Sequence, residues 1–86
     1  MARSLTLQRS IVPAHQRNDY LQRLHQRRDH YARANCKFWV CEEAGLPGAF
    51  LEFAEAGDPA TLAAAHSAAP GAMGESARIY QEVEIK

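Results

Sequence analysis

Residues 37–55 read KFWVCEEAGLPGAFLEFAE, and this stretch decides the fold. Residues 37–43 and 49–55 are rich in aromatic and aliphatic side chains, a composition that is typical of β-strands. The five residues between them, 44–48, include two glycines and one proline. Because so short a connection joins antiparallel neighbours, the stretch predicts a β-hairpin.

Both faces of this hairpin are predicted to be apolar. Side chains alternate between the two faces of a strand, and a sheet with one face in water shows clean alternation of apolar and polar residues. Here Trp39, Leu51 and Phe53 share one parity, and Phe38, Val40 and Phe50 share the other. We therefore expect helices to cover one face and a second copy of the chain to cover the other, most simply about a two-fold axis. The sequence thus predicts a homodimer.

Periodic segments on either side of the hairpin supply four further elements. Alternation with a period of two predicts strands, and apolar residues spaced by three and four predict a helix. Asp58 and Pro59 suit the cap and the first position of a second helix. The expected ranges are 3–12 for the first strand, 14–35 for the first helix, 59–68 for the second helix and 77–85 for the last strand. Pro13 and Asn35 are expected to end the first two elements, and Pro70, Gly71 and Gly74 to break the second helix.

The order strand, helix, strand, strand, helix, strand predicts an α+β fold. Right-handed crossovers turn this order into a ferredoxin-like βαββαβ unit, a four-stranded antiparallel sheet with both helices on one face. With 86 residues, the chain is expected to form a single domain over residues 1–86. Domains of this size bury only about 60% of their unfolded surface, so a partner subunit is a natural source of further burial.

Composition limits the function classes. The formal net charge is zero, but residues 1–37 carry eight basic against two acidic side chains, and residues 38–86 carry two basic against eight acidic ones. This segregation fits either an anion-binding face or a solvated basic helix beside acidic strands, and we favour the solvated helix. No stretch approaches the roughly 20 apolar residues of a membrane span, and no signal peptide is evident, so we expect a cytoplasmic protein without membrane contact.

Cofactor and metal chemistry have little support in the sequence. Cys36 and Cys41 are too few for a disulfide scaffold, and with the four histidines they lack the close paired spacing of a zinc site. No glycine-rich phosphate loop or nucleophile elbow is present. We therefore predict no metal and no cofactor.

The pattern resembles the dimeric α/β barrel superfamily, which includes the antibiotic-biosynthesis-monooxygenase-like domains. The resemblance covers nearly the whole chain, and it lies in the helix 20–31, the strand 38–40, the hairpin 45–53 and the closing strand 78–83. It implies dimerisation through the open sheet face and a ligand pocket between the sheet and the helices. The superfamily's activities include cofactor-independent oxygenation, haem degradation, cyclisation, isomerisation and mutarotation. The absence of asparagine from the first strand argues against haem degradation.

Five residues are candidates for the pocket. Arg28 lies on the apolar stripe of the first helix, where it would bind an anionic ligand, pair with Glu52, the acid in the middle of an apolar strand, or extend its charged end to water. His66 follows Leu62 by one turn, so it is a candidate general base, although it also fits an exposed position at a helix end. Tyr31 and Trp39 would form aromatic walls, a role that suits a dimer interface equally well.

We therefore predict a homodimer with monooxygenase-like or isomerase-like chemistry on a small aromatic or polyketide-like molecule. An alternative is a non-enzymatic dimeric module that binds a small apolar ligand or has a structural role. A third reading is an RNA-recognition motif, which has the same element order and stacks bases on exposed aromatics. Thr6 and Gly48 occupy positions where that motif places aromatics, and the second half of the chain is acidic, so we predict no nucleic-acid partner.

Overall fold

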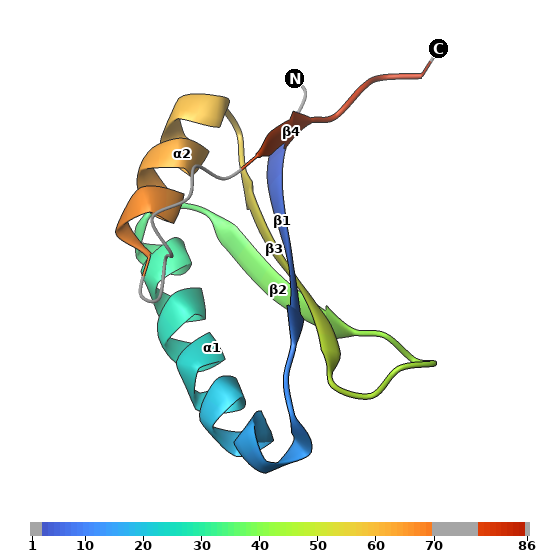
Figure 1. The fold of residues 1–86 in the computed structure, drawn as a ribbon. Coiled ribbons are helices and arrows are strands. Elements are labelled where there is room, and N and C mark those ends of the chain that lie inside the picture. The colour runs from blue at the N-terminus through green and yellow to red at the C-terminus, as the bar shows by residue number, and fades with distance from the viewer. Residues whose placement is uncertain (1–2, 70–77, 86) are drawn as a thin grey trace.

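The computed structural model describes residues 3–69 and 78–85, and it forms an α+β fold with two helices and a four-stranded antiparallel sheet (Figure 1). The sheet has the strand order β2-β3-β1-β4, so β2 and β4 are its edges. The elements are β1 (Ser4–Ile11), the 3₁₀ turn η1 (Ala14–Gln16), α1 (Arg17–Arg33), β2 (Lys37–Glu42), β3 (Ala49–Ala56), α2 (Pro59–Ala68) and β4 (Ile79–Gln81).

The local signals for helix ends are confirmed. Asp58 caps α2, because its carboxylate accepts a hydrogen bond of 2.8 Å from the Thr61 amide, and Pro59 opens the helix. Asn35 has a φ of 63°, the left-handed conformation in which helices commonly end. The first helix begins with a 3₁₀ turn rather than as an α-helix. The expected break at 70–74 lies outside the described residues.

The last strand is shorter than predicted. It was expected over 77–85, but β4 pairs with β1 only at three positions, Ser4 with Gln81, Leu5 with Tyr80 and Thr6 with Ile79. One further hydrogen bond runs from the Glu82 amide to the Arg3 carbonyl at 2.9 Å. Residues 83–85 continue the alternating sequence of a strand, but among the described residues they are not assigned to one.

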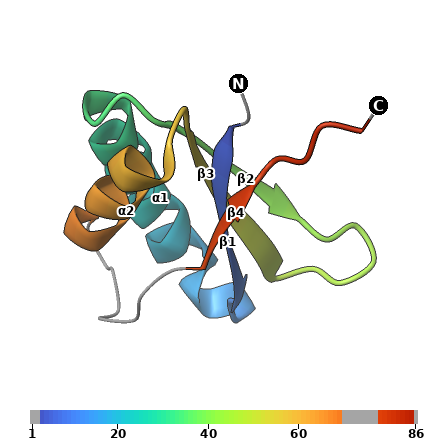
Figure 2. The same ribbon diagram turned by 90° about the horizontal axis from the view of Figure 1, so that it is seen from above.

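Both helices lie on the same side of the sheet, and the core lies between the two layers (Figure 2). Leu62 and Tyr31 are fully buried there, together with Ala54 and Ala65. The β1 residues that face this core are small: Ser4 and Thr6 are buried, while Leu7 on the alternate parity is exposed. The larger aliphatic side chains of β1 therefore point to the open face of the sheet.

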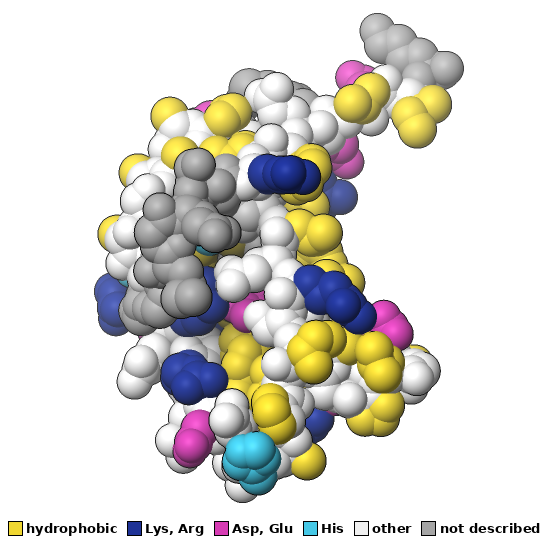
Figure 3. All heavy atoms as spheres, in the orientation of Figure 1, with side chains coloured by type: hydrophobic (Ala, Val, Ile, Leu, Met, Phe, Trp, Pro, Cys, Tyr) yellow, Lys and Arg dark blue, Asp and Glu magenta, His cyan; other side chains and the backbone are white. Residues whose placement is uncertain are grey.

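The open face carries a row of apolar side chains across three strands. Leu7, Phe53 and Trp39 are register partners on β1, β3 and β2, and the Phe53 and Trp39 rings stack with centroids 5.2 Å apart. Leu7 is 47% exposed and Trp39 is 38% exposed. The prediction that both faces of the hairpin are apolar is confirmed. We call Leu7, Trp39, Leu51 and Phe53 the open-face patch. Figure 3 shows hydrophobic side chains gathered along the sheet beside the helices.

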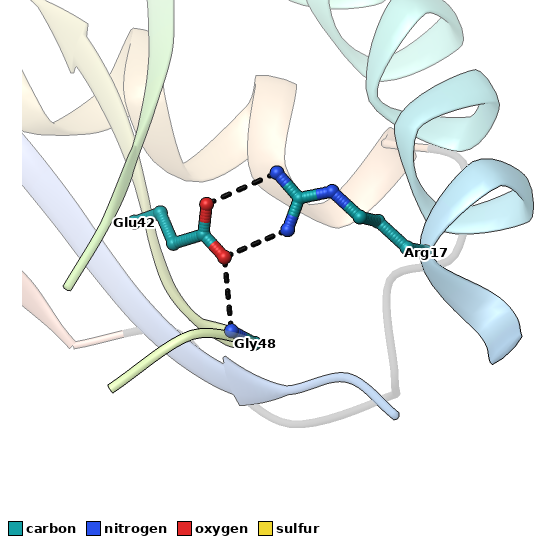
Figure 4. Close-up of polar contacts among 3 residues, drawn as sticks. All are labelled: Arg17, Glu42 and Gly48. Atoms are coloured by element: carbon teal, nitrogen blue, oxygen red, sulfur yellow. Dashed lines mark hydrogen bonds and ion pairs between the residues drawn. The ribbon is translucent and has the colours of Figure 1, made fainter. Parts of the chain in front are cut away.

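A charged clamp fixes the β2–β3 turn against the start of α1. The Arg17 guanidinium donates two hydrogen bonds to Glu42, at 2.7 and 3.0 Å, and the Gly48 amide donates a third at 2.9 Å (Figure 4). Because these donors favour the charged carboxylate, the pKa of Glu42 falls to about 2. Gly48 has a φ of +92°, and a Cβ there would approach the Val12 carbonyl oxygen to 2.7 Å, so glycine is required at this position.

Candidate functional site

The inner face of α1 presents polar groups to the sheet. Tyr20, Arg27 and Tyr31 are spaced by seven and four residues, so they fall on one side of the helix. Tyr20 and Tyr31 are buried, and only 11% of the Arg27 side chain is exposed. An arginine in this position requires an acidic partner, because an unpaired buried charge is expensive.

Glu52 supplies that partner from the middle of β3. It shares the helix-facing parity with Phe50 and Ala54, and its side chain is 3% exposed. Its Oε1 lies 2.8 Å from Arg27 Nη1, and its Oε2 accepts a hydrogen bond of 3.0 Å from the Tyr20 hydroxyl. Glu52, Arg27 and Tyr20 therefore form a buried polar cluster between the two layers.

The cluster retains unused hydrogen-bonding capacity. Within the described residues, Arg27 Nε is buried without a hydrogen-bond partner, and the contact of Glu52 Oε1 with Arg27 lacks the alignment of a hydrogen bond. Burial is the main cause that raises the pKa of Tyr20, and the neighbouring Glu52 charge is the second. The phenol therefore stays protonated and donates its hydrogen bond to Glu52. A carboxylate beside a neutral phenol is an arrangement that can accept and donate protons.

A cavity of about 340 Å³ opens beside the cluster, between α1 and strands β1 and β3. Its polar lining includes Gln8, Ser10, Gln16, Tyr20, Arg27 and Glu52, and Ile11, Val12 and Leu24 contribute apolar surface. This volume lies in the range of small-molecule sites, which combine apolar walls with a few convergent polar groups. We call this space the Glu52 cavity.

The predicted pairing of Arg28 with Glu52 is wrong by one residue, whereas the alternative, an Arg28 side chain that extends to water, agrees with its exposure. Arg28 is exposed, and its Nη2 lies 3.1 Å from His25 Nδ1, whereas Arg27 pairs with Glu52. Successive helical residues are about 100° apart, so Arg28 points away from the side that Arg27 shares with Tyr20 and Tyr31. The seven-residue spacing from the buried Tyr20 was the signal that could have identified Arg27.

Two other predicted residues, Tyr31 and His66, meet each other. The Tyr31 hydroxyl lies 3.1 Å from His66 Nδ1, and its ring stacks on Phe38 with centroids 5.1 Å apart. Burial, together with the nearby Arg27 charge, lowers the pKa of His66. Burial raises the pKa of Tyr31. Neither residue lines the Glu52 cavity.

Trp39 and Arg28 line a second space, along the edge strand β2. This groove of about 390 Å³ lies between α1 and β2, and its other lining residues are Leu21, Leu24, His25, Phe38 and Val40. The five predicted residues are thus distributed over three places: Glu52 at the cavity, Tyr31 with His66 at the α1–α2 contact, and Arg28 with Trp39 in this second space. We call it the β2 groove.

Among residues 3–69 and 78–85, no three histidine, cysteine or acidic side chains are grouped as metal ligands. No helix in the same part of the chain is long and apolar enough to cross a bilayer. No family model, curated protein or solved structure matches the chain.

Proposed function

We propose that the protein is a homodimeric, ferredoxin-like α/β barrel in which the open-face patches of two copies pack against each other. The patch supports this proposal because it presents aromatic and aliphatic side chains on the uncovered side of the sheet. Ion pairs lie at its margins: Arg3 is 3.7 Å from Glu55, and Arg9 is 3.8 Å from Glu43. An apolar centre with a charged rim is the usual anatomy of a subunit interface.

The dimer is tested by placing a charge inside the patch. Leu7→Asp and Phe53→Asp are expected to convert a two-chain particle into a monomer in multi-angle light scattering at micromolar concentration, because an aspartate would be desolvated without a partner. Gln22→Asp puts the same charge on the exposed surface of α1 and serves as the control. Folded dimers from both patch variants would overturn this part of the proposal.

Each protomer's Glu52 cavity is proposed to bind a small aromatic or polyketide-like molecule and to shift a proton on it, as an isomerase does. The observation that carries this proposal is the Glu52 carboxylate on the cavity wall, beside the Tyr20 phenol and the Arg27 guanidinium. Glu52 is only 4% exposed. Glu52 would take a proton from a carbon next to a carbonyl group and return it to another atom of the same molecule. Arg27 and Tyr20 would stabilise the enolate oxygen.

The test uses 4-hydroxyphenylpyruvate as a probe, because it combines an aromatic ring with an enolisable carbonyl. Exchange of its C3 protons in D₂O is followed by NMR, and amide shifts of the labelled protein report where it binds. Glu52→Gln is expected to slow protein-dependent exchange by roughly 10²- to 10⁴-fold, the usual contribution of a general base. Glu55→Gln, on the alternate parity of the same strand, is the matched control.

Tyr20→Phe gives an independent variant, since it keeps the ring against Phe50 and loses only the hydroxyl. It is expected to slow exchange while leaving the protein folded. Binding at the cavity without exchange would make the protein a non-enzymatic ligand-binding dimer. If neither this probe nor a series of hydroxylated benzoates and acetophenones shifts cavity amides, the cavity has no role as a ligand site.

A further inference from the structure

The Glu52 cavity has a second arginine among its lining residues. Arg23 lies one helical turn before Arg27 on α1, so the two side chains project toward the same side of the helix from Cβ atoms about 5–6 Å apart. Arg27 is nearly buried against Glu52, whereas Arg23 is exposed. Because Arg23 both lines the cavity and reaches solvent, we place it at the cavity mouth.

The Arg23 guanidinium is available to a ligand. Arg27 is paired with Glu52, but Arg23 makes no ion pair within the described residues. Its charge still acts inside the cavity: burial and the Glu52 charge raise the pKa of Tyr20, and the charges of Arg27 and Arg23 oppose that rise. A ligand bound against the Tyr20 hydroxyl would therefore lie within the influence of Arg23.

The charges around the cavity leave one positive charge uncompensated. Its charged lining residues are Arg23, Arg27 and Glu52, which gives two positive charges against one negative charge. The other polar lining residues are uncharged, namely Gln8, Ser10, Gln16, Tyr20 and Gln26. A carboxylate, with a single negative charge, balances this surplus. A phosphate dianion would instead leave a net negative charge next to Glu52.

Repulsion from Glu52 determines where such a carboxylate lies. Against the buried Glu52 it would meet a like charge in a poorly screened environment, which is unfavourable. At Arg23 the same carboxylate meets an opposite charge, accepts charge-assisted hydrogen bonds and keeps contact with water. The anionic end of a ligand therefore belongs at the mouth, and Ile11, Val12 and Leu24 supply apolar surface for the rest of the molecule.

We propose that Arg23 is a specificity-determining residue that selects substrates with a carboxylate, so that the cavity acts on keto acids in preference to neutral ketones. This inference rests on the function proposed above and names its substrate class. Arg23 binds the carboxylate at the mouth, while Arg27 and Tyr20 bind the carbonyl oxygen further in. The carboxylate keeps its charge while the proton moves, so the Arg23 contact contributes to binding rather than to the chemical step.

Two ligands that differ only at the carboxylate test this selection. 4-Hydroxyphenylpyruvate and 4-hydroxyphenylacetone share the ring, the methylene group and the ketone, but the second has a methyl group where the first has its carboxylate. Their dissociation constants are measured from amide shifts of the labelled full chain. The wild type is expected to bind the keto acid at least about tenfold more tightly, the effect of hydrogen bonds to a charged group.

Three arginine variants locate the source of this preference. Arg23→Gln is expected to weaken binding of the keto acid and bring the two constants within about threefold of each other. Arg23→Lys keeps the charge without the planar fork, so it is expected to retain part of the preference. Arg28→Gln is the matched control, because it removes the same charge from an exposed position of α1 outside the cavity lining. It is expected to leave both constants within about twofold.

Exchange kinetics separate binding from chemistry. For the keto acid, Arg23→Gln is expected to raise KM about tenfold and to change kcat by less than about threefold, because it leaves Glu52, Arg27 and Tyr20 in place. A fall in kcat at an unchanged KM would contradict a role in selecting the substrate.

The selection by Arg23 and the isomerase activity can fail separately. An undiminished preference in Arg23→Gln, with Glu52-dependent exchange retained, would overturn the selection and leave the isomerase. A preference that depends on Arg23, without any exchange, would support the selection and overturn the isomerase. An equal loss of keto-acid binding in Arg28→Gln would overturn the selection, because the basic helix as a whole would then attract the anion. Failure of both ligands to bind at the cavity would overturn it as well.

Discussion

Replacing Arg27 with methionine removes the guanidinium that faces the buried Glu52 carboxylate. The side chains of this pair are 11% and 3% exposed, and the two charged groups are 2.8 Å apart. Methionine keeps most of the aliphatic volume of arginine, so the main change is the loss of a counter-charge. The Glu52 carboxylate would then be held by the Tyr20 hydroxyl, which is uncharged.

The expected cost is large for a chain of this size. Breaking one side of a buried ion pair typically removes about 3–5 kcal/mol from the free energy of unfolding. A domain of 86 residues has a total stability of roughly 4–13 kcal/mol, so the single change removes a quarter or more of it. At about 4–8 °C per kcal/mol, the melting temperature is expected to fall by roughly 12 °C or more.

Urea unfolding followed by circular dichroism measures the effect, at one fixed protein concentration so that any dimer contributes equally. Arg33→Met, on an exposed part of the last turn of the same helix, is the control and is expected to change stability by less than about 1 kcal/mol. The double variant Arg27→Met/Glu52→Leu removes both charges and is expected to regain most of the loss. A loss below about 1 kcal/mol for Arg27→Met would refute a tightly coupled buried pair.

Three other predictions concern the fold. Glu42→Gln should destabilise the protein above pH 5. The pKa of the Glu42 carboxyl is about 2 in the folded chain and ordinarily 4.5, so the difference in stability from the wild type should vanish as the pH falls from 4.5 to 2. Acid titrations followed by circular dichroism measure this difference, and Glu43→Gln is the control. Gly48→Ala should lower the urea midpoint, since φ is +92° and the new Cβ would meet Val12, whereas Gly45→Ala meets nothing within 4 Å. Asp58→Ala should cost about 1 kcal/mol of unfolding free energy through loss of the α2 cap, and an unchanged melting curve would contradict that role.

The sequence determined the elements, because each has a local cause. Asp58 and Pro59 begin α2 whatever lies around it, and Asn35 can adopt the left-handed conformation that ends α1. The five residues of the turn join β2 to β3 as antiparallel neighbours. Periodicity likewise showed that both faces of the hairpin are apolar, a property of the strands themselves.

Tertiary packing decided which residues these elements bring together. Alternation along β1 places Leu5, Leu7 and Ile11 on one side together with Arg9, and smaller polar residues on the other, but it does not determine which side is buried. The structure buries Ser4 and Thr6 on the side of the sheet that α2 packs against, and Leu62 of α2 is fully buried. The leucines were thereby left on the open face.

The candidate site depended on packing in the same way. Arg27 and Glu52 are 25 positions apart, and neighbouring arginines at 27 and 28 have the same chemistry, so only the rotation of α1 against β3 selects between them. The length of β4 is a second case: the alternating sequence continues through Ile85, whereas the pairing with β1 stops at Gln81. Short-range interactions within the local sequence determine the backbone conformation of each element. Which side of a helix or strand is buried depends instead on how the elements pack together over long range.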